Sequence, residues 1–89
     1  MLIALIARDK LGALQIRLDT RAEHVAYLKS SGAVSQAGPL LDAAGDMCGS
    51  LVVLDVADMA EAKAWAAADP YAHAGLFASV ELIAWNKVI

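Results

Sequence analysis

Three largely apolar runs stand out along the chain, and each has the length of a buried strand. MLIALIA (1–7) is ended by the charged residues RDK, while SLVVLDVA (50–57) and LFASVELIAW (76–85) are rich in β-branched or aromatic residues. Runs of this length favour strands, because a helix needs a longer periodic pattern. A fourth strand is predicted over VSQAGPLL (34–41), where Pro39 lacks the N–H that a ladder needs. That strand should therefore lie at a sheet edge or be bulged beside Gly38 and Pro39.

Two segments between these runs have helical signals. In residues 19–32, Thr20 and Glu23 have the spacing of a capping box, and Gly32 is a natural stop. Apolar side chains then recur at Ala22, Val25 and Leu28. In the second segment, Asp58 and Glu61 repeat the capping pattern ahead of EAKAWAAAD, which consists mostly of good helix formers.

The predicted order is β-α-β-β-α-β within a single domain over residues 1–89. This order is typical of the ferredoxin-like arrangement, an α+β fold in which two helices pack on one face of an antiparallel sheet. A sheet with one solvated face should alternate apolar and polar residues, yet these strands are apolar at nearly every position. The helices cover only one face. We therefore expect a homodimer in which two sheets pack face to face and form a dimeric α+β barrel.

Composition supports a partner for the bare face. Apolar residues make up 60% of this small chain, and its mean hydropathy is +0.55. No apolar run approaches the roughly 20 residues that span a bilayer, and no basic segment precedes the first run as in a signal peptide. The net charge of −3 disfavours nucleic acid as a partner, and the single cysteine, Cys48, fits a reducing cytoplasm.

His24 and Asp69 are the candidates for chemistry. His24 falls at the border of the buried helix stripe, about 40° from Leu28 on a helical wheel. A half-exposed surface histidine is the plainer interpretation. Asp69 precedes Pro70, where the helix should end, and a carboxylate at that end faces the negative pole of the helix dipole. A neighbouring histidine would compensate, and the two side chains would form an acid–base pair if the helices bring them together.

Other residues give weaker signals. Arg8, Arg17 and Arg21 could bind a carboxylate or phenolate, although exposed arginines usually serve only as solvated surface. His73 shares no ligand spacing with His24, so no metal site is indicated. No glycine-rich phosphate loop is present either, and we expect no cofactor.

The order and spacing of RAEHVAYL, AGPLL, GSLVVLDV and ADPYAHAGLF resemble the YciI (YCII-related) family over essentially the whole chain. The resemblance implies a dimeric α+β barrel with an active site built from the family's His and Asp, which match His24 and Asp69. The family's Gly-Pro pair matches Gly38 and Pro39, and its aromatic residue after Asp-Pro matches Tyr71. Members linked to a reaction act by elimination or dehalogenation on small oxygenated rings.

The leading hypothesis is a small, cofactor-independent enzyme of lyase or isomerase type. His24 and Asp69 would perform acid–base chemistry, and Arg17, Gly38, Pro39 and Tyr71 would shape the site for an unidentified small substrate. The alternative is a non-catalytic module that binds a small molecule or docks to a larger enzyme. A third hypothesis is a barrel-type monooxygenase without a bound cofactor, but no specific feature of the sequence supports it.

Overall fold

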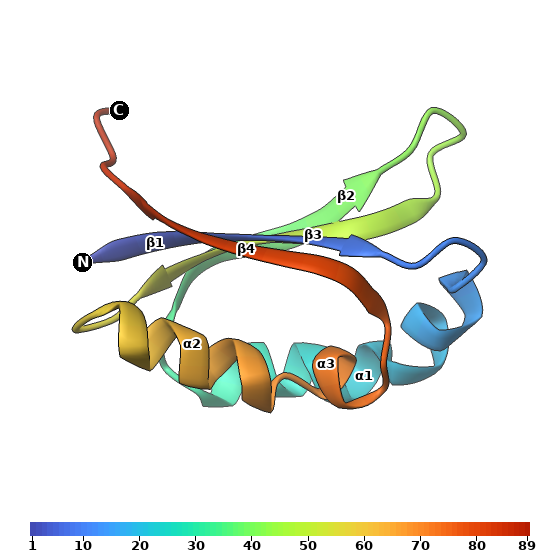
Figure 1. Cartoon of the computed structure of the whole chain (residues 1–89), viewed down its shortest axis with the longest axis horizontal. Coiled ribbons are helices and arrows are strands. Elements are labelled where there is room, and N and C mark those ends of the chain that lie inside the picture. Colours follow the sequence, from blue (N-terminus) through green and yellow to red (C-terminus); the bar gives the residue numbers. More distant parts are fainter.

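The computed structural model describes all 89 residues, and its elements follow the predicted order with one short helix added (Figure 1). The elements are β1 (Leu2–Asp9), α1 (Leu14–Ser30), β2 (Val34–Leu41), β3 (Met47–Asp55), α2 (Met59–Ala68), α3 (Pro70–His73) and β4 (Phe77–Trp85). None of the helices has the length and apolar character needed to cross a bilayer.

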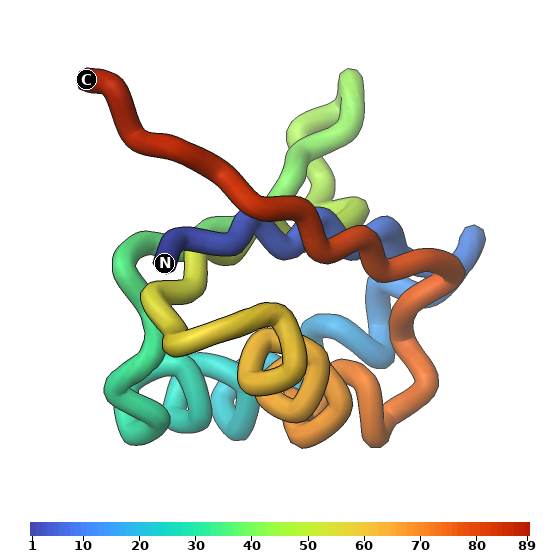
Figure 2. The backbone as a smooth tube through the Cα atoms, turned by 60° about the vertical axis from the view of Figure 1, so that its left-hand side comes forward, coloured from blue at the N-terminus to red at the C-terminus, as the bar shows by residue number.

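The four strands form one antiparallel sheet in the order β2-β3-β1-β4. Leu5 in the central strand β1 lies opposite Val52 on one side and Leu82 on the other. All helices lie against the same face of the sheet, as both backbone views show (Figures 1 and 2). The predicted ferredoxin-like fold is therefore confirmed.

The core lies between the sheet and the helices. Side chains of β1 alternate between the two faces, so Ile3, Leu5 and Ala7 are buried beneath the helices while the residues between them are partly exposed. Val52 and Leu54 continue this layer on β3. The remaining members of the core are Val56, Ala62 and Trp65.

The opposite face of the sheet carries no helix, and large apolar side chains are exposed on it. Leu51, Ile83 and Trp85 have exposed fractions of 41%, 52% and 40%. The strands are thus apolar on both faces, as the sequence pattern indicates. A second copy covering this face stays a prediction.

The N-terminal end of α1 differs from the sequence prediction. The helix begins at Leu14 and runs through Thr20 and Glu23, which lie in its interior and form no capping box. Its N-cap is Ala13, whose side chain makes no capping hydrogen bond. The additional turns bring Arg17 onto the helix, and Arg17 and His24 are its only fully buried residues.

Two other local predictions hold. β2 is an edge strand, in which Pro39 lies opposite Ser50, although its register shifts fall near the strand ends rather than at Pro39. Asp58 caps α2 by accepting a hydrogen bond from the Glu61 backbone N–H at 2.9 Å.

Candidate active site

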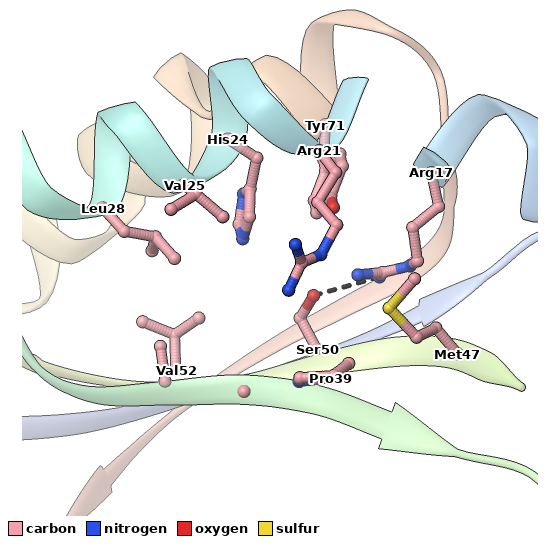
Figure 3. Close-up of a pocket in the computed structure, with 12 residues that line it drawn as sticks. Arg17, Arg21, His24, Val25, Leu28, Pro39, Met47, Ser50, Val52 and Tyr71 are labelled. Atoms are coloured by element: carbon pink, nitrogen blue, oxygen red, sulfur yellow. Dashed lines mark hydrogen bonds between the residues drawn. The ribbon is translucent and has the colours of Figure 1, made fainter. Parts of the chain in front are cut away.

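A cavity of about 210 Å³ lies between the inner side of α1 and the β2–β3 hairpin (Figure 3). Polar and apolar side chains of α1, together with Tyr71 of α3, form its roof, and the hairpin forms its floor. The lining includes five of the six residues predicted from the sequence: Arg17, His24, Gly38, Pro39 and Tyr71. The sixth, Asp69, does not line the cavity.

His24 and Asp69 are in contact, as the sequence analysis anticipated. The Nδ1 atom of His24 lies 2.8 Å from Oδ1 of Asp69, and the two side chains are 8% and 3% exposed. The interpretation of His24 as a half-exposed surface residue is therefore wrong. The contact joins α1 to the short helix that follows α2.

Asp69 has a second role that the sequence analysis missed. Its side chain caps α3 by accepting a hydrogen bond from the Tyr71 backbone N–H at 2.9 Å, with Pro70 in the first turn. Aspartate at the N-cap followed by proline is a favourable helix start. Asp69 ends α2, but it also begins α3, so its placement is not simply unfavourable. The Asp-Pro pair already contained this signal.

The contact with Asp69 fixes how the neutral imidazole of His24 is protonated. A carboxylate only accepts hydrogen bonds, so the neutral ring must carry its hydrogen on Nδ1. Its Nε2 atom then has a free lone pair. The ring extends from α1 into the cavity (Figure 3), where this lone pair is available to accept a proton from a bound molecule.

Tyr71 holds the imidazole from one side. The two rings are stacked, with centroids 3.8 Å apart and planes 17° from parallel. The guanidinium carbon of Arg17 lies 4.5 Å from the centroid of the same tyrosine ring, and Tyr71 appears between His24 and Arg17 in Figure 3. Burial raises the pKa of Tyr71, and the charges of Arg17 and Arg21 partly oppose that rise.

Arg17 is held by a buried ion pair. Its Nε and Nη2 atoms donate to the two carboxylate oxygens of Asp9 at 2.7 and 2.8 Å, and Nη2 also donates to the hydroxyl of Ser50 at 3.0 Å. Burial tends to lower the pKa of Arg17, but the hydrogen bonds and charge of Asp9 raise it overall. These contacts give Arg17 a supporting role at the cavity wall, and substrate binding by Arg17 stays a prediction.

The cavity also contains two polar residues that the sequence analysis did not assign to the site. Arg21 was considered there as one of three arginines that could bind a carboxylate or phenolate, although a solvated surface role was favoured, and Ser50 was noted only as the first residue of a strand. In Figure 3 the guanidinium of Arg21 points into the cavity toward Ser50. Correct placement of the helix start would have added Arg17 to the helix face that Arg21 and His24 already share in the predicted segment, because residues at i, i+4 and i+7 align.

Comparison with known proteins shows the family of the chain. The family model of the YCII-related domain matches residues 1–86. The chain belongs to the YCII-related family. It is 35% identical to the protein YciI of Escherichia coli over 97 aligned positions, which cover 99% of each chain, and 34% identical to an uncharacterized protein of Haemophilus influenzae with the same coverage.

A solved structure extends the likeness to three dimensions. The 5-chloro-2-hydroxyhydroquinone dehydrochlorinase (TftG) of Burkholderia phenoliruptrix AC1100, in complex with 2,5-dihydroxybenzoquinone, superposes with a TM-score of 0.90. It is 33% identical in sequence, and the match covers 97% of this chain and 94% of that chain. The fold of this YCII-related protein is thus shared with an enzyme that binds a small ring compound.

Proposed function

We propose that this YCII-related protein is a small-molecule enzyme that catalyses proton transfer, leading to elimination or isomerisation, on a hydroxylated ring. His24 acts as the general base, and Asp69 orients it. The observation that carries the proposal is the buried contact of 2.8 Å between His24 Nδ1 and Asp69, with the other ring nitrogen left to the cavity. The likeness to a dehydrochlorinase supports the same class of reaction.

The dimensions of the cavity fit a small substrate. Its volume of about 210 Å³ is below the roughly 300 Å³ at which pockets for drug-sized ligands begin. Val25, Leu28 and Val52 provide apolar surface, and the polar groups come from α1 and Ser50. A single flat ring bearing oxygen substituents matches this mixture of apolar walls and a few polar groups.

The chemistry needs only proton transfers. Nε2 of His24 takes a proton from a ring hydroxyl, and the O–H bonding pair stays on the oxygen. When that oxygen becomes a carbonyl, protonated His24 returns the proton to a ring carbon, which completes an isomerisation. In an elimination, a leaving group then departs from that carbon with its bond pair while a second hydroxyl loses its proton and becomes a carbonyl. One proton and one anion are then released, and no oxidant is consumed.

The test is anaerobic turnover of 5-chloro-2-hydroxyhydroquinone, followed by the release of chloride. We expect the wild-type protein to release chloride, and His24→Asn and Asp69→Asn to be slower by roughly 10²–10⁴-fold, the usual contribution of a general base. His73→Asn is the matched control, because His73 is exposed and lies outside the cavity.

Turnover by His24→Asn at the wild-type rate would remove the histidine from the mechanism. Tight binding of hydroxylated rings without turnover of any of them would instead favour the non-catalytic binding module.

We also propose that two copies pair through the bare sheet face. The support is the set of exposed apolar side chains on that face, including Leu51, Ile83 and Trp85, which the helices leave uncovered. Sedimentation velocity at micromolar concentration should show a dimer, and Ile83→Glu should shift it toward monomer. A stable wild-type monomer under these conditions would contradict the pairing.

A further inference from the structure

We propose that Arg21 and Ser50 form an oxyanion-binding site within the cavity and restrict the substrate to small planar molecules with an ionised oxygen. The inference rests on the proposed function, because it concerns the ligand of the same cavity. It goes further by naming the charge of that ligand and the two side chains that recognise it.

Arg21 is the arginine of the cavity whose charge is not already neutralised. The guanidinium of Arg17 is paired with Asp9, whereas Arg21 takes part in no ion pair. Its side chain nonetheless points into the cavity rather than away along the helix surface (Figure 3). A guanidinium offers several N–H donors in a planar fork, which suits a carboxylate, phenolate or enolate oxygen.

Ser50 offers a donor beside this charge. The residue is only 3% exposed, and its oxygen accepts a hydrogen bond from Arg17 Nη2 at 3.0 Å. A hydroxyl has one hydrogen to donate, and the structure gives that hydrogen of Ser50 no acceptor. Because Arg17 is fixed by Asp9, the serine oxygen is held in place and its hydrogen is free for a ligand in the cavity.

The two donors come from opposite sides of the cavity, Arg21 from α1 and Ser50 from β3 (Figure 3). An oxygen bound between them would carry negative charge in the ground state or gain it when His24 removes a proton. Ser50 is held in place by Arg17, whereas Arg21 is exposed and makes no other hydrogen bond or ion pair. Donors aimed at a developing oxyanion stabilise the transition state of such a reaction. The site therefore accounts for both the selection of an anion and the stabilisation of the oxyanion that the base creates.

The experiment compares two ring probes by isothermal titration calorimetry at neutral pH. The hydroxyls of 2,5-dihydroxybenzoquinone are ionised under these conditions, whereas hydroquinone is uncharged. We expect the wild-type protein to bind the anionic probe at least tenfold more tightly. Arg21→Gln should weaken binding of the anion by roughly ten- to a hundredfold, as expected for a charge-assisted hydrogen bond, and leave hydroquinone unaffected. Arg21→Lys should retain part of the preference.

Lys63→Gln is the matched control, because it removes one positive charge from an exposed position on α2 that lies outside the cavity. Ser50→Ala should also weaken binding of the anion, with thermal unfolding used to verify that the variant is folded. Equal affinity of the wild-type protein for both probes, or an unchanged preference in Arg21→Gln, overturns the oxyanion site.

The calorimetric result is separable from the proposed function. His24→Asn should lose turnover but keep the Arg21-dependent preference for the anion, since binding does not require the base. If His24→Asn abolished chloride release while Arg21→Gln changed neither the affinity for the anion nor KM, the oxyanion site alone would be overturned. An Arg21-dependent preference without any turnover would overturn the proposed catalysis alone.

Discussion

The ring of Tyr71 stacks on the imidazole of His24, with centroids 3.8 Å apart, while its backbone N–H binds the carboxylate that holds the same imidazole. Tyr71 is only 1% exposed. Asp69 and Tyr71 thus restrain His24 in two ways, one through a hydrogen bond in the ring plane and the other through contact with the ring face. A base restrained in this way loses little entropy when it accepts a proton from a bound molecule.

This stacking predicts different effects for two substitutions of Tyr71. Tyr71→Phe keeps the aromatic ring and should change the turnover rate by less than about tenfold. Tyr71→Leu removes the ring and should lower kcat more strongly, with a cost of about 1–3 kcal/mol in the free energy of unfolding. Steady-state kinetics and urea denaturation at fixed protein concentration measure both effects. Equal kcat in the two variants would show that stacking does not position His24.

Much of the fold is predictable from the sequence, because the apolar runs and the turns between them are local signals. The edge position of β2 followed from Pro39, and the cap of α2 followed from Asp58 and Glu61. The start of α1 was not predicted correctly. The spacing of Thr20 and Glu23 imitates a capping box, and its interior position in a longer helix became clear only from the structure.

The candidate site was predictable only in part. His24 and Asp69 are 45 positions apart, and their contact depends on how α1 and α3 pack on the sheet. Because Arg17 and His24 are the buried residues of α1, a stripe of apolar residues does not identify the buried face of this helix. The unfavourable position of Asp69 at a helix end suggested the pairing with His24 only on the condition that the helices meet, and the family resemblance supported the same pair. The correct helix start would have added Arg17 to the helix, whereas Arg21 already lay within the predicted segment, three residues before His24.

The buried ion pair between Asp9 and Arg17 predicts a large loss of stability when one partner is removed. Asp9→Asn leaves the guanidinium without its charged partner at a site only 2% exposed, so the free energy of unfolding should fall by about 3–5 kcal/mol. The double variant Asp9→Asn with Arg17→Met removes both charges, and its free energy of unfolding should fall by less than the sum of the losses in the two single variants. Urea denaturation at constant protein concentration provides these values.

Asp19→Asn is the control for that experiment. Asp19 is an exposed residue that accepts a hydrogen bond from Gln15, and its replacement should change stability by no more than about 0.5 kcal/mol. If Asp9→Asn were as stable as this control, the ion pair would contribute nothing to the fold.

The tyrosines predict a loss of stability at alkaline pH. Burial raises the pKa of both Tyr71 and Tyr27 above the usual value of 10.0, and the charge of Asp69 adds to the effect at each. The unfolded chain therefore loses these protons at a lower pH than the folded protein. This contribution to stability is complete below pH 10 and is lost as the pH rises above it.

Phenolate absorbance is the measurement, because the chain contains only two tyrosines. In the folded protein the absorbance should rise above pH 10, together with a fall in the midpoint of thermal unfolding. Tyr27→Phe should make that fall less steep. Ionisation of both tyrosines at or below pH 10 in the folded protein would contradict the prediction.

In the proposed mechanism His24 faces its ligand through Nε2 while Asp69 holds Nδ1. Nitrogen NMR of the imidazoles, during a titration with 2,5-dihydroxybenzoquinone, tests it most directly, and the exposed His73 serves as an internal control. Neutral His24 should carry its hydrogen on Nδ1, and its Nε2 resonance should shift as the ring compound binds, while His73 is unaffected. A hydrogen on Nε2 of neutral His24, or resonances of His24 that do not respond to a ligand that binds, would show that His24 does not face the ligand through Nε2.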